Sequence, residues 1–455
     1  MRAALLGCGA GCACGASPSA RVVSWRAPDF ALPPQPGERE VDPAAVAAAS
    51  RGALFGPWGL FGYHSALEVA AGAGDASFVQ ALLRAGVDPT AGAQLGPWGI
   101  FGAFSPLGSA AAAGHADVVE ALLRSGASPR AGTTLLGGMV LDARPLWRAV
   151  HSDSLDAVQA LLRGGAAPDA GLAWGAFGCL GSVSPLAHAT RVGDAEMVEE
   201  LLRAGASPDG GLALGPFGLL SRYSPLENAV ANGHSDIVEL LLRAGADPNA
   251  GDASGGLLGV LFMERSRPLW RAVANRDRRS AAALLAAGAQ PEVGRALGPF
   301  GCWLAETPLA AAARAGDAPL LRKLLRAGAD PNAGCAIGPG ALFSHTSPLA
   351  HAAARGHGEA VHALLAAGAS PVVGESGGPF ALAFRNTPLS EAARGGHTEV
   401  VGMLLDAGAS PSAGYALGPL GLCGRASPLQ YAVRSGAADA AELLLAALGY
   451  RKDGQ

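Results

Sequence analysis

The segment from Ser224 to Asn249, SPLENAVANGHSDIVELLLRAGADPN, contains the pattern that decides the fold. Ser224 is a favoured helix cap, and Pro225 suits the first position of a helix. Gly233 and Gly245 are placed where helices end, because glycine tolerates the left-handed turn that follows a helix. Apolar residues recur at helical spacing before and after Gly233: Leu226, Ala229, Val230, and then Ile237, Val238, Leu241, Leu242. The segment therefore predicts helix, turn, helix and loop.

The same pattern recurs along the chain at a nearly constant spacing. Copies begin at residues 65, 105, 144, 184, 224, 267, 307, 347, 387 and 427. A fixed period of this size indicates a solenoid or a propeller. Helices of eight or nine residues are not stable alone in water, so each copy must cover its apolar face with the neighbouring copies. The sequence therefore predicts ten stacked helix pairs over residues 65–455.

These motifs resemble the ankyrin repeat. The V-V-x-x-L-L pattern of that family matches Val118–Leu123, and its G-A-D-P-N-A pattern matches Gly328–Ala333. The resemblance covers residues 65–455. It implies two antiparallel helices per repeat, a projecting hairpin or loop between repeats, and a concave surface that binds other proteins. We therefore expect an all-α, ankyrin-type solenoid.

Two features depart from the usual pattern of that family. The family usually has His after T-P-L, in a hydrogen-bond network between repeats, whereas this chain has other residues there, among them Glu68, Trp147, Glu227 and Ser390. The second departure is length, because each copy carries about seven residues more than the family period.

The additional residues lie between the Gly-x-x-Pro turn and the next S-P-L motif. They contain a recurring Gly-Pro step, which favours a turn, so we predict elongated hairpins with Gly-Pro-x-Gly at or near the tip. Trp98, Phe217 and Phe300 occupy equivalent positions in this turn. Two interpretations stay open: neighbouring hairpins pack on one another and bury these aromatics, or the aromatics form an exposed binding stripe.

Residues 1–64 are interpreted separately, because residues 1–40 lack the period. Residues 1–28 contain three arginines and no acidic residue. A disordered tail, a cleaved targeting peptide and lipidation of Cys8, Cys12 or Cys14 are the alternatives for this region. Residues 41–64 are predicted to form a partial repeat that caps the stack.

The sequence contains no pattern that indicates catalysis or a cofactor. There is no P-loop, no HExxH and no Ser/His/Asp order, and the seven cysteines have no zinc spacing. His115, His234, His357 and His397 recur after the glycine that ends the first helix, and we interpret them as structural. We therefore expect no enzyme, no cofactor and no metal.

Charge and cysteine usage bear on the location and the class of partner. The net charge of −4 lacks the basic excess that nucleic-acid binding usually demands. Scattered cysteines fit a reducing compartment, so we expect a cytoplasmic protein, with organelle targeting through residues 1–28 as the alternative. The uncharged stretches 91–116 and 170–190 contain glycine and proline and stay in phase with the repeat, so we expect no transmembrane span.

The resemblance implies that the last residues of each first helix face the concave groove. One of the last two residues before the glycine is arginine in the last four copies and in the fourth copy: Arg314, Arg355, Arg394, Arg434 and Arg191. In one interpretation these arginines only favour the helix dipole. In the other they form a basic track for an acidic segment of a partner.

We therefore expect a protein-protein interaction scaffold that uses its concave face and its hairpin loops, as a monomer rather than an oligomer. The alternative is a structural protein that self-associates through the apolar hairpins.

Overall fold

The computed structural model describes residues 53–450 except 56–61, 96–101, 131–132, 136–140, 175–180, 215–220, 255–263, 298–303, 338–343, 378–383 and 418–423. The predicted tail (residues 1–40), most of the predicted N-terminal cap, and Trp98, Phe217 and Phe300 lie outside the described residues.

The described residues form stacked helix pairs, which confirms the predicted fold class. The first helices of the pairs are α3 (Ala66–Ala73), α5 (Pro106–Ala113), α7 (Pro145–His151), α9 (Pro185–Val192), α11 (Pro225–Asn232), α13 (Pro268–Ala274), α15 (Pro308–Ala315), α17 (Pro348–Ala354), α19 (Pro388–Gly395) and α21 (Pro428–Ser435). The second helices are α4 (Ala76–Arg84), α6 (Ala116–Arg124), α8 (Leu155–Arg163), α10 (Ala195–Arg203), α12 (Ser235–Arg243), α14 (Arg278–Ala286), α16 (Ala318–Arg326), α18 (Gly358–Ala366), α20 (Thr398–Asp406) and α22 (Ala438–Ala447).

The stems of the predicted hairpins pair into one antiparallel ladder. The strands are β1 (Ala53–Phe55), β2 (Gly62–His64), β3 (Ala93–Leu95), β4 (Gly102–Phe104), β5 (Thr133–Leu135), β6 (Leu141–Ala143), β7 (Leu172–Trp174), β8 (Gly181–Val183), β9 (Leu212–Leu214), β10 (Ser221–Tyr223), β11 (Asp252–Ser254), β12 (Glu264–Ser266), β13 (Arg295–Leu297), β14 (Leu304–Glu306), β15 (Cys335–Ile337), β16 (Ser344–Thr346), β17 (Glu375–Gly377), β18 (Phe384–Asn386), β19 (Tyr415–Leu417) and β20 (Gly424–Ala426). Pairing continues between repeats, as in β2 with β3 and β14 with β15, so each hairpin contacts the next along the described part of the chain.

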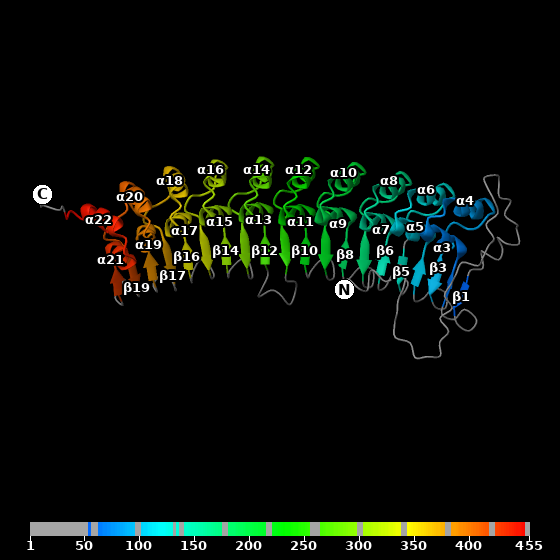
Figure 1. Ribbon diagram of the computed structural model, residues 1–455, viewed down its shortest axis with the longest axis horizontal. Helices are drawn as coiled ribbons and strands as arrows, with labels where there is room; N and C mark the ends of the chain where they lie inside the picture. Colours follow the sequence, from blue (N-terminus) through cyan, green and yellow to red (C-terminus); the bar gives the residue numbers. More distant parts are fainter. Residues whose placement is uncertain are drawn as a thin grey trace. The chain divides into compact units, whose positions relative to one another are not determined.

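Three rows result from this arrangement. Figure 1 shows the second helices in one row, the strands in another, and the first helices between them. Each first helix packs on the first helix of the next repeat, as α17 does on α19, and each second helix on the next second helix, as α18 does on α20.

Serine and threonine caps connect the start of six first helices to the end of their own repeat. The hydroxyl of Ser347 accepts the backbone N–H of Ala350 at 3.2 Å and donates to the carbonyl of Val373 at 2.6 Å. A cap of this kind contributes about 1 kcal/mol. The same donation to a carbonyl 26 residues further along is made by Ser65, Ser184, Ser224, Thr307 and Thr387.

The core runs within and between successive repeats. One continuous cluster of buried side chains extends from Leu67 to Leu444. Leu364 is fully buried, and so are Ala352 and Ala353 on the neighbouring first helix. Alanine at those two positions lets adjacent first helices approach closely, because it adds no side chain beyond Cβ. No helix of the described residues is long and apolar enough to cross a membrane.

A glycine at the entry to eight of the hairpins, among the residues that the structure describes, allows a close backbone contact that the sequence analysis did not single out. A Cβ on Gly334 would lie 1.9 Å from the carbonyl oxygen of Thr346, on the opposite strand of the hairpin stem. No side chain fits at that distance, so only glycine permits the contact. The equivalent distances are 1.7–2.1 Å at Gly92, Gly171, Gly211, Gly251, Gly294, Gly374 and Gly414.

We predict that Gly334→Ala lowers the free energy of unfolding by more than about 3 kcal/mol, because backbone must shift to admit the methyl group. Urea unfolding followed by helical circular dichroism measures the change. Gly402→Ala is the matched control: Gly402 lies within α20 and the added Cβ meets only Leu443, at 4.0 Å. That variant gains about 0.5–1 kcal/mol. Equal effects of the two substitutions would show that the hairpin contact is not required.

Candidate partner-binding surface

The C-terminal ends of the first helices carry one arginine in each of four consecutive repeats, at one position in three of them and one residue further along at Arg355. Arg314, Arg394 and Arg434 lie in the last turns of α15, α19 and α21, which end at glycines with φ between 71° and 73°. Arg355 follows the last residue of α17. Because these four helices stack in order, the four arginines occur once per repeat. We call this set the arginine row.

Arg314 is held by a buried carboxylate. Its guanidinium lies 2.8 Å from Glu306, the last residue of β14, which is only 5% exposed. Arg355 donates from Nη1 to the carbonyl of Arg314 at 2.6 Å. The two side chains are thus oriented by contacts within and between repeats, and Glu306 offsets the charge of Arg314.

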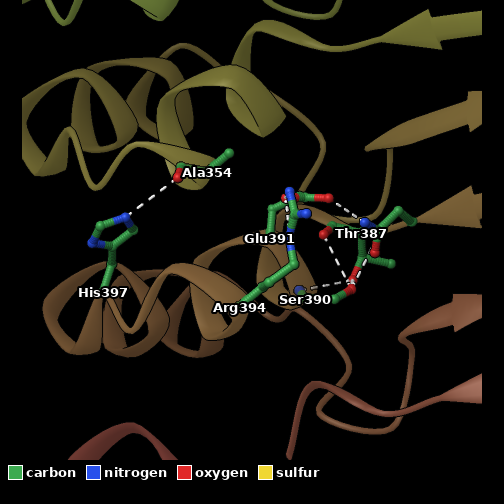
Figure 2. A network of polar contacts seen from close by, with 7 residues as sticks. Ala354, Thr387, Ser390, Glu391, Arg394 and His397 are labelled. Carbon is green, nitrogen blue, oxygen red and sulfur yellow. Dashed lines mark hydrogen bonds and ion pairs between the residues drawn. The ribbon is translucent and has the colours of Figure 1, made fainter. Parts of the chain in front are cut away.

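Arg394 has a similar anchor, which Figure 2 shows. Its Nε and Nη2 atoms lie 3.1 and 2.5 Å from Oε2 of Glu391, which is 5% exposed. Glu391 also accepts a hydrogen bond from Asn386. In the same view, the side chain of Thr387 caps the helix together with that of Ser390.

Arg355 and Arg434 keep their charge uncompensated. Both are exposed, and neither has a carboxylate partner in the part of the chain that the structure describes. The surface therefore alternates between anchored arginines, whose charge is offset by Glu306 or Glu391, and free ones. An incoming carboxylate gains most from the free positions, since their charge is not already paired.

Arg191, in α9, belongs to a different cluster. Its Nη2 lies 3.2 Å from Nδ1 of His188, and because a guanidinium can only donate, Nδ1 accepts. We therefore assign the proton of His188 to Nε2, which lies 3.4 Å from Nδ1 of His151. Trp147 stacks on His151 with ring centroids 4.9 Å apart. Burial, with the nearby charges of His151 and Arg191, lowers the pKa of His188 to about 4.

The position that carries His in the resembled family contains carboxylates in two repeats. Glu227 is fully buried and accepts hydrogen bonds at Oε1 from Ser266 of β12 at 2.9 Å and from Arg271 of the next repeat at 2.5 Å. Burial raises the pKa of Glu227 in spite of these partners. Glu68 accepts from Ser109 in the next repeat, at 2.8 Å. These glutamates therefore connect neighbouring repeats where the family uses His.

The recurring histidines lie against glycines of the preceding repeat. A Cβ on Gly193 would lie 2.4 Å from the ring of His234, and one on Gly356 would lie 2.4 Å from the ring of His397. His397 Nε2 also lies 3.3 Å from the carbonyl oxygen of Ala354, to which it donates (Figure 2). Among the described residues, no three or more His, Cys, Asp or Glu side chains are arranged to hold a metal ion.

Two family models match this chain, and a solved structure is similar to it. The family model described as ankyrin repeats (3 copies) matches residues 67–171, 146–252 and 349–454, and the model described as ankyrin repeat matches residues 306–335. These matches do not set the number of repeats, which stays a prediction. No curated protein matches the chain. The crystal structure of the human ASB11 ankyrin repeat domain is similar, with 23% identity, a TM-score of 0.40, and coverage of 58% of this chain and 97% of that one.

We predict that stability falls on acidification in part through His188. Its pKa is depressed, so the stability it contributes is present above pH 6.5 and is lost as the pH falls towards 4. Full protonation in the folded state costs roughly 3 kcal/mol. Wild type should therefore lose more stability than His188→Gln between about pH 7 and about pH 4.5 in urea unfolding. His362→Gln, at an exposed position of α18, is the control and should follow wild type. Parallel curves for all three proteins would contradict the assignment.

Proposed function

The chain belongs to the ankyrin repeat family, and we propose that it is a non-enzymatic scaffold that binds an acidic segment of a partner protein along the arginine row. Ankyrin repeats are in general protein-protein interaction modules. The proposal follows the face that the family resemblance assigns to partner binding, at the ends of the first helices.

The observation that carries the proposal is one arginine at the end of the first helix in each of four consecutive repeats, within two adjacent positions of the repeat. Arginine presents a planar fork that suits carboxylates, so a row of them favours an acidic segment over a neutral one. Arg355 and Arg434 supply charge that no described carboxylate offsets. Arg314 and Arg394 supply side chains already fixed by Glu306 and Glu391.

Arg314 and Arg394 also neutralise buried carboxylates, so changing them would affect the stability of the fold as well as binding. Removing Arg394 leaves Glu391 buried without its cation, and removing Arg314 does the same to Glu306. An unpaired buried charge is strongly destabilising. A variant that changes all four arginines would therefore confuse loss of binding with loss of fold, whereas Arg355 and Arg434 can be changed alone.

The proposal extends to the state and location of the protein. We propose a cytoplasmic monomer. A reducing compartment agrees with Cys335, the described cysteine, which is a free thiol. Burial raises the pKa of that thiol, with Glu306 adding to the effect, so it is a poor nucleophile.

We predict that Arg355→Glu/Arg434→Glu loses partner binding. Quantitative capture from a cell extract should recover the bound protein about tenfold less with this variant than with wild type, and added salt should weaken wild-type capture. Arg84→Glu/Arg163→Glu makes the same charge change at exposed ends of second helices and should capture as wild type does. Equal recovery by the two double variants, with circular dichroism unchanged in both, would rule out the arginine row as the binding surface.

A further inference from the structure

Helix α14 differs from the second helices on either side of it. After its first turn, three of its exposed or half-exposed positions, those of Ala282, Ala283 and Ala286, carry alanine where α12 and α16 have long side chains in the same register. A fourth alanine, Ala287, follows the helix. At the register of Ala286, α12 has Arg243 and α16 has Arg326. The surface of the second-helix row is therefore recessed at α14, because its side chains are short there.

The recessed surface is an open groove of about 810 Å³. It lies on the second helices, whereas the arginine row lies at the ends of the first helices. Its floor is the four alanines. Leu242, Arg243 and Glu239 form the wall on the α12 side, and Lys323 forms the wall on the α16 side. Arg278 and Arg279 lie at the end where α14 begins. We call this the α14 groove.

The α14 groove is rimmed by cations. Helices α14 and α16 contain no Asp or Glu and carry five cations between them: Arg278, Arg279, Arg322, Lys323 and Arg326. Lys323 and Arg326 have no carboxylate partner among the described residues. Of the described residues that line the groove, Glu239 is the one carboxylate, and it is already paired with Arg243 and Arg279. The groove therefore presents positive charge around an apolar floor.

The two arginines at the start of α14 do not stabilise that helix through its dipole. Cations are unfavourable at a helix N-terminus, by a few tenths of a kcal/mol to about 1 kcal/mol. Arg278 pairs with Asp317 at 2.9 Å and Arg279 with Asp236 at 2.7 Å, but both guanidinium side chains remain more than half exposed. Ion pairs that exposed contribute little. Both side chains therefore remain able to bind carboxylates from another molecule.

We propose that the α14 groove is a second docking surface, which holds an acidic amphipathic helix of a partner protein. The alanine floor lets a helix backbone approach α14 closely, and Leu242 and the alanines meet its apolar face. The cationic rim pairs with carboxylates along its edges. A nine-residue helix such as α14 is about 13 Å long, so the groove accommodates roughly two to three turns of the partner helix.

The experiment uses the full chain and a fluorescein-labelled synthetic helix of about four turns, with leucine and alanine on one face and glutamates along both edges. Fluorescence anisotropy gives the affinity. Wild type binds this peptide, and binding weakens as salt is added. Ala286→Glu, which places a negative charge in the groove, and Lys323→Glu each weaken binding about tenfold or more.

Ala366→Glu is the matched control, because Ala366 occupies the same exposed register at the end of α18. It binds the peptide as wild type does, and so does Arg355→Glu/Arg434→Glu, which separates this surface from the arginine row. Equal affinity of Ala286→Glu and Ala366→Glu would overturn the proposal. So would a groove-dependent preference for phosphatidylserine vesicles or duplex DNA over the peptide, since either would assign the α14 groove to a different ligand.

Discussion

Contact between each helix pair and the next is the interaction on which the rest of the structure depends. Helices of seven to ten residues do not persist alone in water. Here their apolar faces are covered by the partner helix of the same pair and by the adjacent pairs, within one continuous buried cluster that includes Leu364, Ala352 and Ala353. The stability of any one repeat is therefore a property of its neighbours as well as of its own sequence.

The same constraint separates residues that must be kept from residues that can specialise. The buried leucines, most of the helix caps and the hairpin-entry glycines recur because they hold the stacked helices and the hairpin stems in place. The ends of the first helices and the exposed faces of the second helices are not fixed by stacking. Arg355 and Ala286 lie at such positions, and each departs from its neighbours without disturbing the core. The two proposed binding surfaces thus arise where the repeat permits variation.

Much of this fold could be predicted from sequence because the controlling signals are local. Ser224, Pro225 and Gly233 set the bounds of α11 through caps and backbone preferences that act over a few residues. The hairpin-entry contact of Gly334 with Thr346 was not predicted, because it depends on how the whole hairpin closes. The pairing of hairpin stems between repeats likewise depends on their alignment across the stack.

The candidate binding surfaces were harder to predict from sequence, because they too depend on residues that only the fold brings together. The register of the arginine row could be read from the repeat, but not its anchoring: Glu306 lies on a strand eight residues before Arg314, and only the fold brings the two together. The α14 groove leaves a signal in the sequence, since Ala282, Ala283 and Ala286 replace the long side chains that α12 and α16 carry at the same registers. That signal becomes visible only when these helices are compared register by register.

Hydrogen exchange of the full chain, measured by mass spectrometry, tests the central claim most directly. If neighbouring repeats stabilise one another through helices and hairpin stems alike, backbone amides of β14, β15 and α15 in the interior of the stack exchange slowly and together, and those of α22 exchange faster. Exchange of the interior stems at the rate of an unfolded peptide, while the helices stay protected, would contradict the account.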